Sequence, residues 1–129
     1  MAFSSVHEMI DLCKESGKPL YEVILESDLA ESGLTRADSE AEMLRLWAVM
    51  QATSDGYCGA DRSMSGFAGG DAAKVNAAAA RGVLYADGYF ADVMAEALKT
   101  AECNACMKRI VAAPTAGSCG VLPAVLLPL

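Results

Sequence analysis

The chain has 129 residues, which is enough for one domain with a hydrophobic core, and no linker-like composition divides it. Hydrophobic residues make up 53% of the sequence but aromatic residues only 6%, a composition that favours closely packed helices rich in Ala, Leu, Val and Met. The formal net charge of -7 argues against a nucleic-acid-binding protein, because phosphate binding needs clustered Lys and Arg. The sequence predicts a single unit over residues 1–129.

The sequence shows no sign of export or membrane insertion. It has no charged segment followed by an apolar one at its start, so no secretory signal is expected. The five cysteines are an odd number and are expected to be reduced thiols. The apolar residues 121–129 are too few to span a membrane, and Pro123 and Pro128 interrupt them. We expect a cytoplasmic protein that binds neither nucleic acid nor a membrane.

Local capping signals predict two helices near the start of the chain. Ser5 and Glu8 have the spacing of a reciprocal capping pair, and Gly17 and Pro19 should end that first helix. Pro19 suits the first position of a second helix, which should end near Ser32 and Gly33.

A third and longer helix should begin at Thr35, which has Asp38 three residues later. An apolar stripe at helical spacing is expected to lie in the core rather than to bind a cofactor, and it consists of Met43, Leu46, Trp47 and Met50.

The second half of the chain alternates between glycine-rich segments and helices. Residues 54–70 are too rich in Gly for a helix, and Asp71 should be the N-cap of a helix over Ala72–Arg81 that ends at Gly82. A further helix is predicted over about Gly88–Met107, with Phe90, Val93, Met94, Ala97 and Leu98 facing inward.

Residues 121–129 are interpreted as the start of a buried helix. Because no strand-like alternation appears anywhere, the predicted fold class is all-α. We expect a compact helical domain with two Gly-rich loops leading into helices.

Two glycine-rich segments, residues 65–71 and residues 114–120, are the main candidates for a binding site. Glycines can turn backbone N–H groups toward a ligand, and a helix N-terminus adds partial positive charge, so each segment could hold a carboxylate or a phosphate. Neither segment matches a phosphate-loop pattern. Helix capping and close packing explain the glycines equally well.

The cysteines and one serine suggest other chemistry. Cys103 and Cys106 lack the second pair or the histidines of a zinc site, since His7 is expected to be a solvated surface residue. Cys119 would add a third thiolate, enough for an iron–sulfur cluster with an open iron, but packing as small hydrophobic residues is the favoured interpretation. A small metal-binding helical protein stays open as an alternative. Ser118 lacks the flanking pattern of a hydrolase nucleophile.

Residues 110–124, with the sequence IVAAPTAGSCGVLPA, resemble the iron–sulfur-dependent L-serine dehydratases, also called L-serine deaminases or ammonia-lyases. Residues 65–72 and 102–105 agree with the same family, and the resemblance covers about residues 5–127. It implies an all-helical catalytic unit and, for this chain, the N-terminal part of an alpha chain that normally pairs with a beta chain.

The resemblance also implies a reaction and a cofactor. Water is eliminated from L-serine, and the product becomes pyruvate and ammonium. A 4Fe-4S cluster acts as Lewis acid in place of pyridoxal phosphate. The family holds the cluster with cysteines in a Gly-Gly-Cys-Gln segment and in a Cys-Asp-Pro segment followed by Pro-Cys, and none of these occurs before Leu129. We therefore expect the cluster ligands to lie outside this chain and assign it no metal ligand.

Within this family, the two glycine-rich segments would form the substrate side of the site. The residues expected to bind or orient L-serine are Thr115, Gly117, Ser118 and Gly120, with Gly69, Gly70 and Asp71 as an adjoining wall. The catalytic base is not predicted. We expect the chain alone to be inactive and to aggregate or form oligomers. The alternative is a non-catalytic helical remnant that pairs with a beta chain, and the coding sequence beyond Leu129 would distinguish the two.

Overall fold

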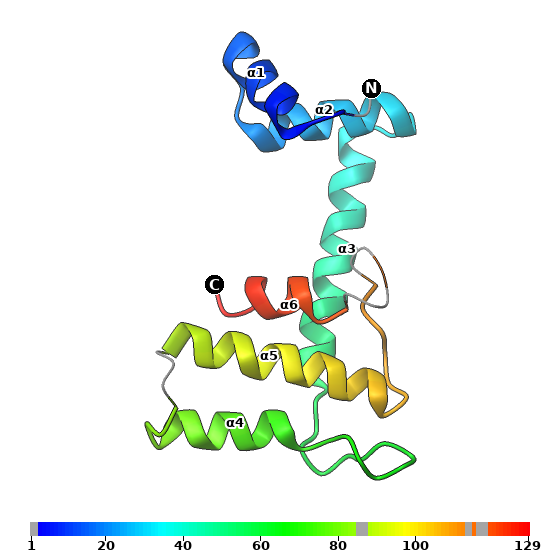
Figure 1. Cartoon of the computed structure of the whole chain (residues 1–129). Helices are drawn as coiled ribbons and strands as arrows, with labels where there is room; N and C mark the ends of the chain where they lie inside the picture. The colour runs from blue at the N-terminus through cyan, green and yellow to red at the C-terminus, as the bar shows by residue number, and fades with distance from the viewer. Residues whose placement is uncertain (1–2, 85–87, 113–114, 116–118) are drawn as a thin grey trace. The chain divides into compact units, whose positions relative to one another are not determined.

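The structure is a computed structural model that describes residues 3–84, 88–112, 115 and 119–129. The regular structure of these residues consists entirely of α-helices (Figure 1), so the predicted all-α class is confirmed. In chain order the helices are α1 (Val6–Ser16), α2 (Leu20–Ser32), α3 (Arg36–Asp55), α4 (Asp71–Ala80), α5 (Gly88–Ala105) and α6 (Val121–Leu126).

Contacts between residues divide the chain into two compact units, which we call the N-terminal unit (residues 1–44) and the C-terminal unit (residues 45–129). Helix α3 begins in the first unit and ends in the second. The two units are described separately below. That residues 1–129 form a single unit stays a prediction.

In the N-terminal unit, α1 begins and ends where its caps predict. The Ser5 hydroxyl accepts a hydrogen bond from the Glu8 N–H (3.2 Å), and Gly17 ends the helix in the left-handed conformation. The reciprocal hydrogen bond to the Glu8 carboxylate was predicted with the wrong partner. The Glu8 carboxylate accepts hydrogen bonds from the N–H and the hydroxyl of Ser4, at 2.8 and 2.7 Å, rather than from Ser5.

The other two helix starts of this unit differ in how they are capped. Pro19 is the N-cap of α2 rather than its first residue, because its backbone is still extended. Thr35 and Asp38 form the predicted reciprocal pair. The Asp38 N–H donates to the Thr35 hydroxyl, and the Asp38 carboxylate accepts from the Thr35 N–H, both at 3.2 Å.

In the C-terminal unit, α5 packs against both α4 and α6 and lies between them in Figure 1. Each of these two helices runs antiparallel to α5. Consequently α4 and α6 both begin near the end of α5 that carries its last residues. The N-cap residues of these two helices, Gly70 and Gly120, therefore both lie near the C-terminal part of α5.

The buried face of α5 consists mostly of small side chains. The prediction that Phe90 and Met94 face inward is wrong, because both are exposed, whereas Val93, Ala97 and Leu98 are half-buried. Small residues at a helix contact let the backbones approach closely, which leaves the large side chains outside the contact. The buried positions of α5 are Ala91, Ala95, Thr100, Glu102 and Cys103.

A second packing contact surrounds the C-terminal part of α3. Met50 and Val111 are buried there, with Trp47, Val49 and Leu127 packed around them. The predicted core stripe of α3 is therefore confirmed for Trp47 and Met50, and Leu46 is half-buried. It is wrong for Met43, which is exposed.

Helices α4 and α6 begin differently from the prediction. Asp71 is the first residue of α4, and Gly70, in the left-handed conformation, is its N-cap. Pro123 does not interrupt α6, because it lies in the first turn, where a helix N–H has no acceptor within the helix. Pro123 and Ala124 are buried, whereas Val121 is exposed, so only part of α6 is the buried helix start that was expected.

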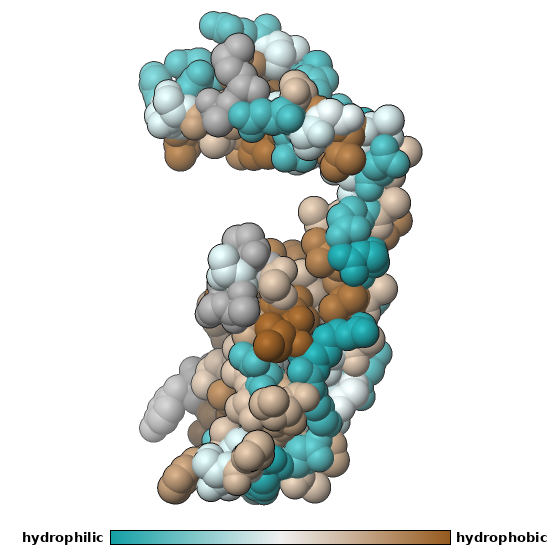
Figure 2. Space-filling model, turned by 90° about the vertical axis from the view of Figure 1, so that its right-hand side faces the viewer, coloured by the Kyte–Doolittle hydropathy of each residue, from teal (hydrophilic) through white to brown (hydrophobic). Residues whose placement is uncertain are grey.

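Hydrophobic side chains also reach the surface. Figure 2 shows one face of the molecule, on which hydrophobic patches lie among hydrophilic ones. Of the helices that the structure describes, none is both long enough and apolar enough to cross a membrane. The exposed large hydrophobic residues of α6 and of the residues after it are Val121, Leu122, Val125, Leu126 and Leu129.

Candidate functional site

The N-terminus of α4 is closed by a buried carboxylate from α5. Glu102 is only 6% exposed, and its carboxylate accepts hydrogen bonds from the backbone N–H groups of three successive residues. The distances are 2.9 Å from Gly70, 2.6 Å from Asp71 and 3.2 Å from Ala72. Negative charge at a helix N-terminus is favourable, and a buried carboxylate needs such donors. Glu102 therefore caps α4 from a different helix.

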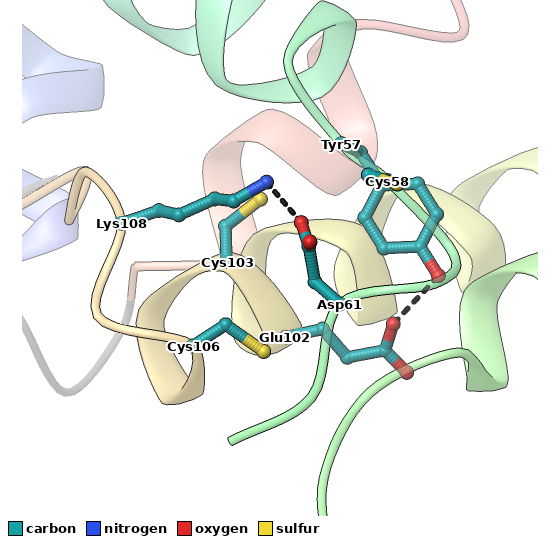
Figure 3. Close-up of a pocket in the computed structure, with 7 residues that line it drawn as sticks. All are labelled: Tyr57, Cys58, Asp61, Glu102, Cys103, Cys106 and Lys108. Atoms are coloured by element: carbon teal, nitrogen blue, oxygen red, sulfur yellow. Dashed lines mark hydrogen bonds and ion pairs between the residues drawn. The ribbon is translucent and has the colours of Figure 1, made fainter. Parts of the chain in front are cut away.

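Tyr57 completes this cap. Its hydroxyl donates to the Glu102 carboxylate at 2.7 Å (Figure 3). The same hydroxyl accepts from the Ala73 N–H at 3.3 Å. Burial, followed by the hydrogen bond to Glu102, raises the pKa of Tyr57 to about 12. The phenol therefore stays protonated and keeps its donor role at neutral pH. The first three N–H groups of α4 are thus all satisfied by side chains.

The glycines before α4 are required by close contacts. Gly69 and Gly70 both have positive φ angles, +124° and +87°. A Cβ on Gly69 would collide with the Asp61 carbonyl oxygen, and a Cβ on Gly70 would lie 2.9 Å from the Arg62 guanidinium. At Gly69 both the backbone conformation and the space require glycine, whereas at Gly70 the positive φ is the main requirement, because the Arg62 side chain can move.

Asp71, a predicted site residue, points its charge away from this cap. Its carboxylate forms an ion pair with Lys74 at 2.7 Å on the exposed side of α4. The hydrogen bond from Lys74 and its positive charge lower the pKa of Asp71. Asp71 therefore contributes its backbone N–H to the buried cap and its side chain to the surface.

A cavity of about 300 Å³ lies beside the start of α4. One side consists of residues 67–69 and Asp71, and the other consists of Leu98, Ala101, Glu102 and Ala105 of α5. Phe67 is 94% exposed at its edge. Two of the predicted wall residues, Gly69 and Asp71, therefore line a cavity large enough for a small molecule.

Two described residues of the second glycine-rich segment, Cys119 and Gly120, lie beside α5. Gly120 is the N-cap of α6, and a Cβ on it would lie 3.2 Å from the Ala97 carbonyl oxygen. The neighbouring Cys119 is buried, and the Asn104 amide nitrogen lies 3.9 Å from its sulfur. Thr115 is exposed. Gly117 and Ser118, also predicted site residues, lie outside the described residues.

Three cysteines line a second pocket together with an ion pair (Figure 3). Asp61 and Lys108 pair across it, and Lys108 also donates to the Gly56 carbonyl oxygen at 3.2 Å. The pocket leaves about 0 Å³ of room for a water molecule, so it is not a substrate site. Its cysteines are Cys58, Cys103 and Cys106.

The cysteines of the described residues do not fit an iron–sulfur cluster. No group of three or more Cys, His, Asp or Glu side chains in the described part of the chain is arranged to hold a metal ion. Cys103 is 2% exposed, and its sulfur lies 3.7 Å from the Thr53 carbonyl oxygen. Burial raises the pKa of its thiol, which disfavours the thiolate that a metal needs.

The sequence interpretation missed Glu102 and Tyr57. One signal was present, because Glu102 continues the stripe of Ala91, Ala95 and Leu98 at spacings of four, three and four residues. A charged residue on the buried face of a helix needs partners and therefore marks a structural or functional site. Tyr57 lies in the glycine-rich loop and carried no such signal.

The described residues define an all-helical protein in which Gly70 and Gly120 precede two helices that pack on one shared helix. The family described as the serine dehydratase alpha chain matches residues 15–129. This chain belongs to that family, which confirms the resemblance inferred from residues 110–124.

Two curated relatives match most of this chain. It is 33% identical over 124 residues to the L-serine dehydratase alpha chain of Peptoniphilus asaccharolyticus, covering 95% of this chain and 42% of the relative. It is 32% identical to the probable L-serine dehydratase alpha chain of Bacillus subtilis (strain 168), covering 96% and 41%. The chain thus spans about two-fifths of the length of these relatives. No solved structure matches it.

Proposed function

We propose that this chain is part of an L-serine ammonia-lyase that converts L-serine to pyruvate and ammonium. The observation that carries the proposal is the family match over residues 15–129. The reaction removes the α-proton and the hydroxyl of serine as water and leaves 2-aminoacrylate. The imine tautomer of this product takes up water and gives pyruvate and ammonia, which is protonated to ammonium.

The two glycine-rich segments would form the substrate side of the site. Backbone N–H groups around Thr115–Gly120, with the hydroxyls of Thr115 and Ser118, would bind the carboxylate of serine or orient the substrate. Gly69, Gly70 and Asp71 would form the adjoining wall. The cavity of about 300 Å³ that Gly69 and Asp71 line supports the role of this wall.

The cofactor and the partner belong to the same proposal. We propose that the ligands of a 4Fe-4S cluster lie outside residues 1–129, since the described thiols do not fit one. No step is assigned to Cys103, Cys106 or Cys119. A beta chain would complete the enzyme, which would act in the cytoplasm without pyridoxal phosphate.

The direct test is to purify the protein that contains this chain without oxygen, together with any subunit that copurifies, and to measure pyruvate formation. We expect pyruvate from L-serine and none from D-serine, because a chiral site that fixes several groups around the α-carbon at once distinguishes the two enantiomers. Absence of turnover in the intact assembly would overturn the proposal. If a second subunit copurified without any turnover, the non-catalytic interaction protein would take its place.

A substitution at Thr115 tests the substrate side. Thr115→Val keeps the shape of the side chain but removes its hydroxyl, and it is expected to raise KM for L-serine about tenfold, the value of one hydrogen bond to a charged group. Ser16→Ala, on the exposed surface of α1, is the control and should leave KM unchanged. Gly120→Val is a poorer test, because its Cβ would press on the Ala97 carbonyl oxygen.

A further inference from the structure

A cavity of about 410 Å³ lies between α3 and the segment that follows α5. Arg45, Leu46 and Val49 of α3 form one wall, and residues 109–112 form the other. The segment after α5 runs beside α3 in Figure 1. Both walls belong to the C-terminal unit. The volume is large enough for a small organic molecule.

The charge around this cavity is entirely positive. Its charged lining residues are Arg45 and Arg109, and Arg109 also lines a cavity of about 250 Å³ together with Lys108. Of the described residues that line either cavity, none is acidic. In the whole chain, acidic residues outnumber basic ones by 17 to 10. The two cavities therefore differ in sign from the protein as a whole, and a negative charge is favoured there.

The guanidinium of Arg109 keeps its donors for a ligand. It makes no hydrogen bond or ion pair with any residue that the structure describes. Lys108, in contrast, already pairs with Asp61 and donates to the Gly56 carbonyl oxygen. An arginine presents its N–H groups as a planar fork, which can hold both oxygens of a carboxylate in parallel hydrogen bonds.

The turn after α5 holds the second wall in place. Met107 has a φ of +60°, and it is the only non-glycine residue with positive φ in the described part of the chain. The Lys108 N–H donates to the Cys103 carbonyl oxygen at 2.9 Å, and the Met107 N–H donates to the Asn104 carbonyl oxygen at 3.1 Å. These two bonds form a Schellman cap, which usually has glycine at the position of Met107. The chain thus accepts an unfavourable backbone conformation immediately before Lys108 and Arg109.

The uncharged part of the lining is aliphatic. Val111 is 1% exposed and packs with Met50 in the core, so it fixes the second wall. Leu46 and Val49 are half-buried, and Ile110 is 48% exposed. An inorganic anion would leave this aliphatic surface uncovered, whereas an uncharged ligand would leave the guanidinium unpaired. A ligand with both an anionic and an apolar part fits both features.

We propose that this cavity binds a small carboxylate with a short aliphatic body, as a ligand other than L-serine. Arg109 holds the carboxylate, and the body lies against the aliphatic side chains of both walls. Arg45 adds a second positive charge at the same cavity. The proposal does not depend on the proposed reaction. The cavity shares no lining residue with the one beside the start of α4.

The first experiment titrates the protein that contains this chain with isovalerate and follows the methyl signals of Leu46, Val49 and Ile110 by NMR. We expect these signals to shift and saturate with a Kd on the order of 1 mM. Isoamyl alcohol lacks the charge and acetate lacks the aliphatic body, so each should bind at least about tenfold more weakly. Shifts that do not saturate, or equal affinity for isoamyl alcohol, would overturn the proposal.

The second experiment changes the guanidinium. Arg109→Gln should raise the Kd for isovalerate about tenfold, because the charged hydrogen bonds are lost. Arg109→Lys keeps the charge without the planar fork and should raise it about threefold. Arg109 is exposed, so both variants are expected to fold. An unchanged Kd in Arg109→Gln would overturn the proposal.

A matched control is available at the end of α4. Arg81 is also an exposed arginine, but it lines neither cavity. Arg81→Gln removes the same charge and should leave the Kd for isovalerate within about twofold of the original value. An equal loss of affinity in Arg81→Gln and Arg109→Gln would show a general effect of net charge and would contradict the assignment to this cavity.

A competition with L-serine separates this inference from the proposed function. L-serine has a carboxylate but no aliphatic body, so it should not displace isovalerate. If it did, and if Arg109→Gln raised KM for L-serine by the same factor, the cavity would be the substrate site and the inference of another ligand would be wrong. Because the titration needs no turnover, binding of isovalerate through Arg109 would stand even if the protein made no pyruvate.

Discussion

At the scale of single residues, the C-terminal unit depends on a few positions where only one side chain fits. Gly69 is the clearest case, because a Cβ there would collide with the Asp61 carbonyl oxygen in addition to the unfavourable φ of +124°. Gly66 shares the positive φ, +75°, but has open space around it. The two glycines therefore separate the cost of backbone conformation from the cost of a collision.

Gly69→Ala is expected to lower the free energy of unfolding by at least about 3 kcal/mol, since strain and collision both act. Gly66→Ala should lower it by only about 1 kcal/mol, the cost of a left-handed conformation for alanine. Urea unfolding of the two variants, with the slope of the transition compared, measures both values. Equal losses at the two positions would show that the Asp61 contact contributes nothing.

The residues that could be predicted from sequence are those whose partners are near in the chain. Ser5, Thr35 and Gly33 are caps whose partners lie three or four residues away, and their roles follow from local geometry. Tyr57 and Glu102 are 45 residues apart, and a local pattern carries no information about a hydrogen bond of that span. The cap of α4 was therefore assigned to Asp71, the nearest residue of a suitable type.

At the scale of helices, the side of a helix that is buried was harder to predict than the presence of the helix. Helix α5 was expected to bury Phe90 and Met94, but the buried face carries Ala91 and Ala95. A prediction from hydrophobicity assigns the large apolar side chains to the buried face. Close contact with two neighbouring helices instead places small side chains there. The composition rich in Ala pointed to close packing but not to the face on which it occurs.

The start of α3 gives a prediction about pH. Hydrogen bonds from the Thr35 hydroxyl and N–H hold the pKa of Asp38 below its ordinary value of 3.8. A carboxyl whose pKa is lower in the folded state stabilises the fold fully above its unfolded pKa. This contribution is lost as the pH falls from about 3.8 through the lower folded pKa.

Thr35→Val removes the hydroxyl and should raise the pKa of Asp38 toward 3.8, so the variant loses less stability than the original protein as the pH falls through this range. Titration of the Asp38 carboxyl carbon by NMR measures the change. Ser5→Ala, which removes the cap of α1, is the control and should leave the Asp38 pKa unchanged. An unaltered Asp38 titration in Thr35→Val would contradict the assignment.

At the scale of the whole molecule, α6 and the residues after it expose several large hydrophobic side chains. Val121 and Leu129 are the most exposed of five large hydrophobic residues there. Contiguous apolar surface on a protein marks a place of contact with another molecule or copy. We therefore expect that residues 1–129, produced alone, associate with one another.

Light scattering after size exclusion should give a mass above that of one chain, 13.4 kDa. Replacing both Val121 and Leu129 by Glu should shift the chain toward the monomer, because added charge disfavours contact between copies. Met64→Glu changes an even more exposed residue of the glycine-rich loop and should leave the association unchanged. A monomeric unchanged chain would contradict the prediction.

The capping of α4 by Glu102 also sets an order of events during synthesis of the chain. The donors Tyr57, Gly70, Asp71 and Ala72 are all made before their acceptor, which follows Gly70 by 32 residues. A nascent chain that has just completed α4 therefore has no carboxylate for its first N–H groups until residue 102 has been added. In the N-terminal unit the caps of α1 and α3 have no such delay, because each capping hydroxyl lies only three residues from its donor.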